Sequence, residues 1–160
     1  MKGNPVSCRI AVMIIKTDIT NDYLDTAYPG VGKIIRAQGF ISQHHDDEIA
    51  MAKWILRTFG GNITLLEERN EESPDYFWRG KYWDLKTPEK KNSVTKRIQK
   101  GLSQIFNNPG GVILDIRKLD IEFDRLDEII DGRMKLSLKK SVDIIIVRDE
   151  DLIKVLRYNR

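Results

Sequence analysis

The chain has 160 residues, a net charge of +3 and a pI near 8.9, with 41% hydrophobic and 32% charged residues. These values are ordinary for a compact domain with one buried core, and the small positive charge indicates only a mild preference for anionic partners. The single cysteine, Cys8, excludes an internal disulfide, and we interpret it as a small apolar side chain rather than a nucleophile.

We expect residues 1–40 to form an N-terminal extension made of a short strand and a loop, and residues 41–160 to form the main domain. The apolar run at residues 10–15 is far too short to cross a membrane, and Lys16 follows it at once, which also argues against a signal peptide. We therefore interpret this run as a strand. The loop after it is marked by Tyr28-Pro29-Gly30.

The first long helix is predicted over residues 43–59, with Ser42 as its N-cap, acidic residues in its first turn and a Gly-Gly pair after its end. Glu48 lies at the border of the apolar face of this helix. It is either an acidic ligand of a site or a glutamate that favours the helix dipole. His44 and His45 would contact phosphate, relay protons or simply be exposed, and a zinc site is disfavoured because the chain has no third histidine.

A β-hairpin is predicted over residues 74–86, where two aromatic stretches flank an Arg-Gly-Lys turn. If Gly80-Lys81 forms the loop, Asp75 lies opposite Lys86. The alternation of side chains along a strand then places Asp75, Asp84 and Lys86 on one face. A slip of one residue would turn Asp75 to the other face.

Two carboxylates held this close repel one another unless a cation lies between them, and oxygen ligands suit Mg²⁺ or Mn²⁺. Such an ion lowers the pKa of a bound water and neutralises charge on a phosphate, while Lys86 would orient the water or stabilise the developing negative charge. A strand predicted over residues 62–68 ends in Glu67 and Glu68, one of which can add a ligand. The alternative is a surface hairpin whose Asp84 and Lys86 are solvated charges.

A second helix is predicted from residue 92 or 93 to about residue 106, because apolar residues recur there at helical spacing. Another face of this helix is polar and basic, and we expect it to bind the phosphates of a nucleic acid. The residues concerned are Lys96, Arg97, Lys100 and Gln104. The alternative is an ordinary solvated helix face.

The last third of the chain supplies framework. Buried strands are predicted over residues 112–116 and 142–147, with a helix between them in residues 120–134. Residues 152–158 fit either a closing strand or a terminal helix. This order of elements predicts an α/β fold in which a mixed β-sheet is flanked by helices.

Pro74-Asp75 followed by Asp84-Leu85-Lys86 resembles the signature of the PD-(D/E)xK nuclease superfamily. The order of elements over about residues 44–147 is similar to that of the C-terminal tRNA nuclease domain of CdiA-type contact-dependent inhibition toxins. The resemblance implies a restriction-endonuclease-like fold, a divalent metal ion and cleavage of RNA. It also implies that Glu48, Asp75 and Asp84 bind the metal and that these three and Lys86 are catalytic.

Three functions stay open. The first is a metal-dependent nuclease acting on tRNA or another RNA, whose unstacked bases would contact Tyr76, Trp78, Tyr82 or Trp83 unless those rings belong to the core. The second is a DNA endonuclease, because the same motif serves both substrates. The third is a binding or structural module without catalysis. A toxin domain would act in the cytoplasm of the cell it enters and would have an immunity protein as a partner; otherwise we expect a cytoplasmic protein.

Overall fold

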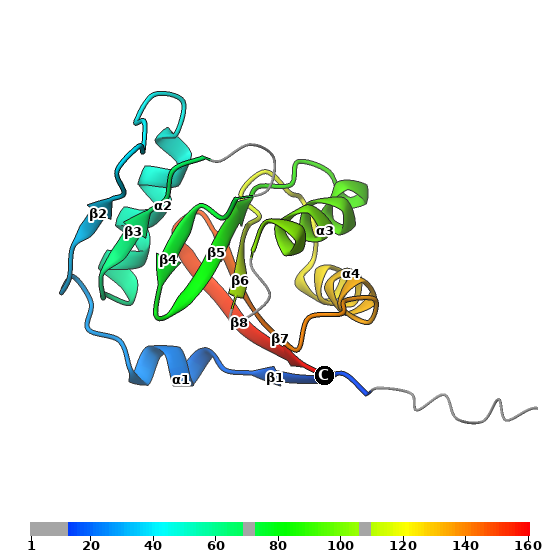
Figure 1. Ribbon diagram of the computed structural model, residues 1–160. Coiled ribbons are helices and arrows are strands. Elements are labelled where there is room, and N and C mark those ends of the chain that lie inside the picture. The colour runs from blue at the N-terminus through cyan, green and yellow to red at the C-terminus, as the bar shows by residue number, and fades with distance from the viewer. Residues whose placement is uncertain (1–12, 69–72, 106–109) are drawn as a thin grey trace, which may run out of the picture.

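In the computed structural model, residues 13–68, 73–105 and 110–160 are described, and they form one mixed β-sheet with helices on both faces (Figure 1). The strands are β1 (Ile15–Asp18), β2 (Ile34–Arg36), β3 (Ile63–Leu65), β4 (Tyr76–Trp78), β5 (Lys81–Lys86), β6 (Gly110–Asp115), β7 (Ser141–Arg148) and β8 (Asp151–Asn159). The helices are α1 (Thr20–Asp25), α2 (Asp46–Thr58), α3 (Val94–Gln104) and α4 (Phe123–Met134), with a short 3₁₀ turn, η2 (Lys91–Ser93), before α3. The strand order is β1-β8-β7-β6-β5-β4-β3-β2.

The predicted α/β class is confirmed, and the ambiguity at residues 152–158 is resolved as a strand that pairs antiparallel with β7. The first long helix begins at Asp46 rather than residue 43, and its N-cap is His45, which makes no side-chain capping bond. The prediction of Ser42 as the cap was therefore wrong. Part of the strand predicted at residues 10–15, and Cys8, lie outside the described residues. Among the described helices, none is both long and apolar enough to cross a membrane.

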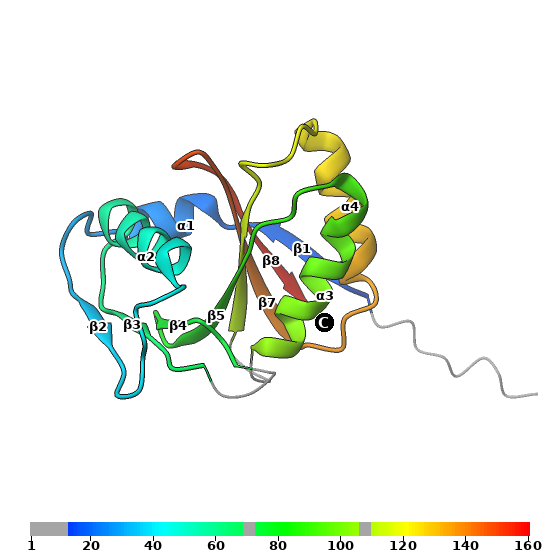
Figure 2. The ribbon, with the colours of Figure 1, turned by 90° about the horizontal axis from the view of Figure 1, so that it is seen from above.

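The sheet separates two hydrophobic cores (Figure 2). Helices α3 and α4 cover one face, on which Val112, Ile144 and Leu156 are buried. Helices α1 and α2 cover the other face, on which Ile113 and Ile145 are buried. Neighbouring residues of β6 and β7 thus point to opposite cores, which explains why these strands are almost continuously apolar.

The described part of residues 1–40 supplies the two edge strands of the sheet. Strand β1 pairs antiparallel with β8, whereas β2 pairs parallel with β3 at the opposite edge. Between them, α1 buries Tyr23 in the aromatic core, and Ile19 just before it is also buried. This segment therefore contains a helix and a second strand in addition to the strand and loop that the sequence predicted.

The β4–β5 hairpin has a different turn from the predicted one. Tyr76 pairs with Trp83, so the loop is Arg79-Gly80 rather than Gly80-Lys81. Both loop residues have positive φ, 52° and 70°, as in a type I′ turn, whose twist matches that of the strands. The change moves the partner of Asp75 from Lys86 to Asp84, a shift of two residues. Because side chains alternate with a period of two, the face that Asp75 shares with Asp84 and Lys86 is unchanged.

Candidate active site

A cavity of about 160 Å³ lies where the first turn of α2, the hairpin and the end of α3 meet, at the carboxyl end of β5. It collects the acidic residues and the lysine of the predicted site on one surface. Its polar lining includes His45, Glu48, Glu68, Asp75, Asp84, Lys86 and Gln104. All four residues that were predicted to be catalytic therefore line a single cavity.

Asp84 is the most buried of these groups, with 1% of its surface exposed. Among the described residues, neither of its buried carboxylate oxygens has a well-formed hydrogen bond, although Nζ of Lys86 lies 2.7 Å from Oδ2. Burial and the nearby charge of Asp75 raise the pKa of Asp84, and Lys86 offsets only part of this effect. The ionised carboxylate is therefore under-compensated by protein groups alone.

Asp75 is fixed by the hairpin backbone, because its Oδ2 accepts a hydrogen bond of 2.8 Å from the backbone N–H of Leu85. Its carboxyl group also interacts with the carboxyl groups of Asp84 and Glu48. Burial raises the pKa of Asp75, and burial followed by the charge of Asp75 raises the pKa of Glu48. The charge of Asp75 thus opposes ionisation of Asp84 and Glu48, whereas contacts with these two carboxyl groups favour the ionised form of Asp75.

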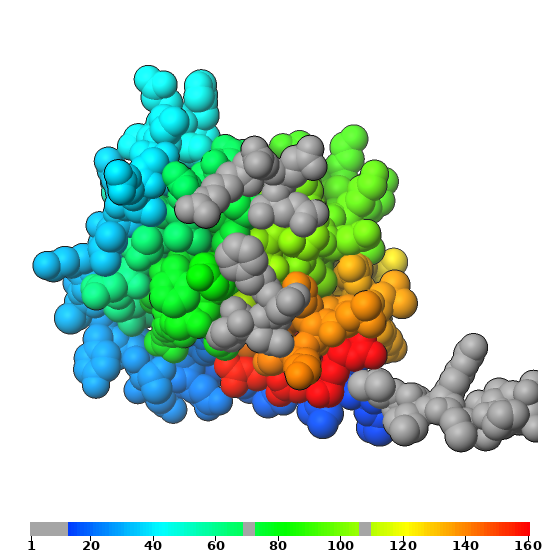
Figure 3. All heavy atoms as spheres, viewed as in Figure 1, coloured from blue at the N-terminus to red at the C-terminus, as the bar shows by residue number. Residues whose placement is uncertain are grey.

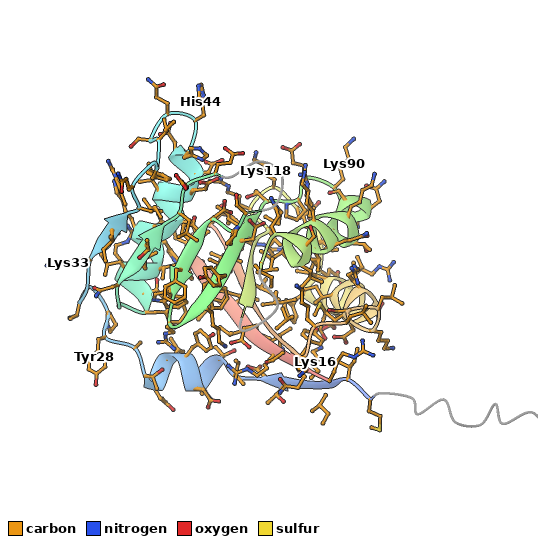
Figure 4. The ribbon with its side chains drawn as sticks, in the orientation of Figure 1. Lys16, Tyr28, Lys33, His44, Lys90 and Lys118 are labelled. Carbon is orange, nitrogen blue, oxygen red and sulfur yellow. The ribbon has the colours of Figure 1, made fainter. Side chains whose placement is uncertain are left out.

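Glu48 is held from two directions. The hydroxyl of Tyr76 donates a hydrogen bond of 2.7 Å to the backbone carbonyl of Glu48. Nδ1 of His45 lies 2.8 Å from Oε2 of Glu48, an ion-pair distance without the geometry of a hydrogen bond. The other ring nitrogen of His45, Nε2, is 3.7 Å from Oε2 of Glu68. The sequence interpretation gave His45 little weight, yet its position three residues before Glu48 at a helix start was the available signal. His44 is exposed at the loop tip before α2 (Figure 4).

The donor atoms fit a hard divalent cation. Carboxylate oxygens are the ligands that Mg²⁺ and Mn²⁺ prefer, and a cation would satisfy the orphaned oxygens of Asp84 and relieve the repulsion with Asp75 and Glu48. In the described part of the chain, no three acidic, histidine or cysteine side chains are already arranged as a closed set of metal ligands. Binding would therefore require these side chains to adjust.

Helix α3 approaches the site closely because residue 101 is a glycine. A Cβ added there would lie 3.1 Å from Cγ2 of Val112 and 3.5 Å from Cγ of Lys86. This approach brings Gln104, one turn further along, to the cavity, where its Oε1 is buried without a hydrogen-bond partner among the described residues. Gln104 therefore lies at the cavity, and its predicted part in substrate binding stays a prediction.

The predicted basic residues of α3 do not line this cavity. Lys96, Arg97 and Lys100 are exposed and line a neighbouring open groove of about 460 Å³. Lys90, which precedes η2, lies near the N-terminal end of α3 (Figure 4). The structure thus separates an acidic centre from a basic surface beside it, with Gln104 and α3 between them.

Most of the aromatic residues of the hairpin belong to the core. Tyr76, Trp78 and Trp83 are buried against α1 and α2, as the core interpretation predicted. Tyr82 and Phe77 point to the opposite face, which also carries Asp84, and their ring centroids are 5.0 Å apart. Phe77 remains 38% exposed, so this pair offers an accessible aromatic surface near the cavity.

The fold and the cavity define a mixed α/β domain with a buried carboxylate centre on a hairpin. Residues 72–153 match the family model described as the contact-dependent growth inhibition CdiA C-terminal domain, and the chain belongs to this family of toxin domains. The predicted resemblance to CdiA-type domains is therefore confirmed, whereas the PD-(D/E)xK assignment stays a prediction. No curated protein and no solved structure matches the chain.

Proposed function

We propose that this domain is a PD-(D/E)xK-type nuclease that depends on a divalent metal ion and cleaves RNA, with tRNA as the leading substrate. The observation that carries the proposal is the convergence of Glu48, Asp75, Asp84 and Lys86 on one cavity. Both oxygens of Asp84 are buried there without a well-formed hydrogen bond in the described part of the chain, and Lys86 is its ion-pair partner. Membership of the CdiA C-terminal family supports it, because domains of this family are commonly nucleases.

Glu48, Asp75 and Asp84 would hold the ion, Mg²⁺ or Mn²⁺. When bound, such an ion lowers the pKa of a coordinated water and neutralises charge on the phosphate. The backbone N–H of Leu85 fixes Asp75, and His45 positions Glu48 from the helix side. The protein thus holds each proposed ligand by a separate contact.

Lys86 and Gln104 supply the remaining polar groups. The ammonium of Lys86, which Asp84 positions, would stabilise the negative charge that develops on the phosphate or orient the attacking water. The free amide oxygen of Gln104 can accept a hydrogen bond from that water. The close packing of α3 at Gly101 keeps both side chains at the cavity.

The substrate preference rests on chemistry beside the cavity. The exposed ring of Phe77 and the half-buried ring of Tyr82 can stack on the unpaired bases of RNA loops and ends, and the basic residues of α3 can bind phosphates. The choice of RNA over DNA follows the family resemblance. As a CdiA toxin domain, the protein would act in the cytoplasm of the target cell that receives it and would be neutralised by an immunity protein.

The test is incubation of the purified chain with total tRNA and with plasmid DNA, each with Mg²⁺ or with a chelator. We expect cleavage of tRNA only with Mg²⁺. Cleavage of plasmid alone would replace the proposal with a DNA endonuclease. Failure to cleave either substrate with Mg²⁺ or Mn²⁺ would identify a non-catalytic module and overturn it.

A further inference from the structure

A second groove, of about 640 Å³, lies on the far side of α3 from the acidic cavity. It is formed by α3, the end of α4 and the segment that follows α4. Gln99 and Ser103 line both this groove and the basic groove of Lys96, Arg97 and Lys100, so the two hollows adjoin across one helix. Figure 3 shows side chains of α3 beside those of the segment after α4 on one face of the molecule.

Both grooves are lined by cations without any acid. Arg133, Lys139 and Lys140 line the second groove, and no Asp or Glu is present in the described lining of either groove. The whole chain carries 27 basic and 24 acidic residues, so six uncompensated cations in two adjoining hollows are a marked segregation of charge. Such a segregation suits a polyanion that extends over both.

Arg133 provides an unused binding group. Its Nε and Nη1 atoms are shielded from solvent, and neither has a hydrogen-bond acceptor in the described part of the chain. Arg133 as a whole is half-buried. A partly buried guanidinium without an acceptor is costly, and the fork of an arginine matches two oxygens of a phosphate. Lys139 is aimed by a hydrogen bond of 3.2 Å from its Nζ to the carbonyl of Ile105, beside the same groove.

The surface is also uncovered. Leu136 and Leu138 are 74% and 88% exposed at the edge of this groove. Apolar side chains next to phosphate-binding cations can pack against the riboses and bases of an unpaired strand. A protein partner would use the same leucines, but the absence of acids and the unpaired guanidinium in the described lining favour the more highly charged ligand.

The order of residues around α3 connects this surface to the acidic cavity. With about 100° between successive residues of a helix, Gln104 and Arg97 lie on the side of Gly101 that faces the site, and Lys100 and Lys96 follow outward. Ser103 and Gln99 come next, and they reach the second groove. The basic residues therefore form a continuous path around the exposed side of the helix.

We propose that the RNA substrate leaves the Asp84 cavity across α3 and continues into the α3–α4 groove, where Arg133, Lys139 and Lys140 bind its phosphates. This inference rests on the proposed function and extends its substrate to a strand long enough to occupy both grooves. The groove contributes affinity and position but no base recognition, because phosphate contacts carry no sequence information.

Binding is measured by fluorescence anisotropy with labelled tRNA and the full chain, in chelator and over a series of salt concentrations. The groove variant Arg133→Gln/Lys139→Gln/Lys140→Gln is compared with Lys33→Gln/Arg36→Gln/Lys53→Gln, which removes the same charge from exposed positions on β2, α2 and the loop before β2 (Lys33 in Figure 4). We expect a loss of affinity of about tenfold and a salt slope smaller by about two for the groove variant, and a change within about twofold for the control.

Cleavage of a labelled trinucleotide with Mg²⁺ separates this inference from the proposed function. The groove variant should cut the trinucleotide as fast as the parent and cut tRNA more slowly, because a short substrate does not reach the second groove. If the groove variant and the parent bind tRNA equally, the inference that this groove binds RNA is overturned, even if the parent cleaves RNA. A protein would then be the remaining candidate ligand for Leu136 and Leu138. A parent that binds tRNA but cleaves nothing would overturn the catalytic proposal alone. A parent without any affinity for tRNA would overturn both.

Discussion

At the scale of single residues, Asp84 is the clearest sign of a functional site. A carboxylate with both oxygens buried and without good hydrogen bonds is expensive for the folded state, and it lies next to two further acids. Structural needs do not explain it, because the hairpin backbone pairs without this side chain. A side chain that destabilises the folded protein in this way is expected at a functional site, where a bound ligand compensates the cost.

Replacing Asp84 with Asn should abolish activity and preserve the fold. We expect RNA cleavage to fall by about 100-fold or more because a charged metal ligand is lost, with a melting temperature at least as high as that of the parent. A nuclease assay and thermal melting followed by circular dichroism check both parts. The matched control is Asp115→Asn, since Asp115 is 6% exposed, pairs with Arg117 and lies outside the cavity. Full activity in Asp84→Asn would mean that the chemistry lies elsewhere.

Asp143 is also a fully buried acid, but its contacts give it a structural role. Its carboxylate receives hydrogen bonds of 2.7 and 2.8 Å from Arg157 and further ones from Lys81 and Tyr23. Burial opposes ionisation of Asp143, but these hydrogen bonds outweigh it and hold its pKa below the usual value. The contacts join α1, the hairpin, β7 and β8, so this residue ties distant parts of the chain together.

We expect Asp143→Asn to destabilise the protein by about 3 kcal/mol, because it leaves the partly buried cations of Lys81 and Arg157 unpaired. A depressed pKa stabilises the fold fully above the unfolded value of about 3.9, and this contribution is lost as the pH falls through the lower folded value. The urea midpoint of the parent should therefore fall steeply below about pH 4, and that of the variant should fall less. The exposed Asp151→Asn serves as the control. Equal midpoints for Asp143→Asn and the parent at pH 7 would contradict this role.

At the scale of elements, alternation and apolar runs predicted the class of fold and the face of the hairpin, but not its turn. The register is set by Arg79, whose guanidinium lies 4.6 Å from the ring centre of Tyr23 and 5.0 Å from that of Trp78. Contacts with α1, which lies more than 50 residues earlier, hold Arg79 at positive φ although it is not a glycine. A contact this distant in sequence cannot be predicted from the local pattern of residues. The predicted face of Asp75 was nevertheless right, because the error in the strand register was two residues and side chains alternate with a period of two.

Contacts between residues distant in sequence also explain why other elements differ from their predictions. The β7–β8 turn places Asp149 and Glu150 at positive φ, and Nε1 of Trp54 donates a hydrogen bond of 2.6 Å to the carbonyl of Glu150. This turn lacks the usual glycine signal, which left residues 152–158 ambiguous. The candidate site was more predictable, because the spacing within one hairpin defines three of its residues. The contact of His45 with Glu48 depends on the residue at which α2 begins. The prediction of Ser42 as the N-cap placed this start too early, so the contact was not predicted.

The aromatic pair of Phe77 and Tyr82, of which Phe77 is exposed and Tyr82 is half-buried, should contribute to substrate binding. We expect Tyr82→Ala to weaken binding of labelled tRNA by about 1–3 kcal/mol, the range for loss of one base stack, and Tyr82→Phe to bind like the parent because the ring is retained. Anisotropy titrations in chelator provide the measurement. Tyr28→Ala is the control, since Tyr28 is 73% exposed on the far side of the sheet from α3 (Figure 4). Parent-like binding by Tyr82→Ala would remove the hairpin face from the substrate path.

At the scale of the whole molecule, the candidate site draws on more of the chain than the matched family segment. Residues 72–153 contain Asp75, Asp84 and Lys86, whereas Glu48 comes from α2 and His45 from its N-cap, both before this segment. Helix α2 is in turn packed against the aromatic core that α1 completes with Tyr23. The position of Glu48 at the cavity therefore depends on the early part of the chain as well as on the hairpin.

This dependence predicts that residues 41–160 alone do not form a stable domain. Removing residues 1–40 deletes β1 and β2, exposes the edges of β8 and β3, and takes Ile19 and Tyr23 out of the core and away from Asp143. We expect the shortened chain to lack a cooperative thermal transition, and the full chain with Tyr23→Phe, which keeps the ring but loses the hydrogen bond, to melt cooperatively at a lower temperature than the parent. Circular dichroism melts of the three proteins measure this. A cooperative transition of residues 41–160 at the melting temperature of the parent would instead show that the first 40 residues are a separable extension, as the sequence alone suggested.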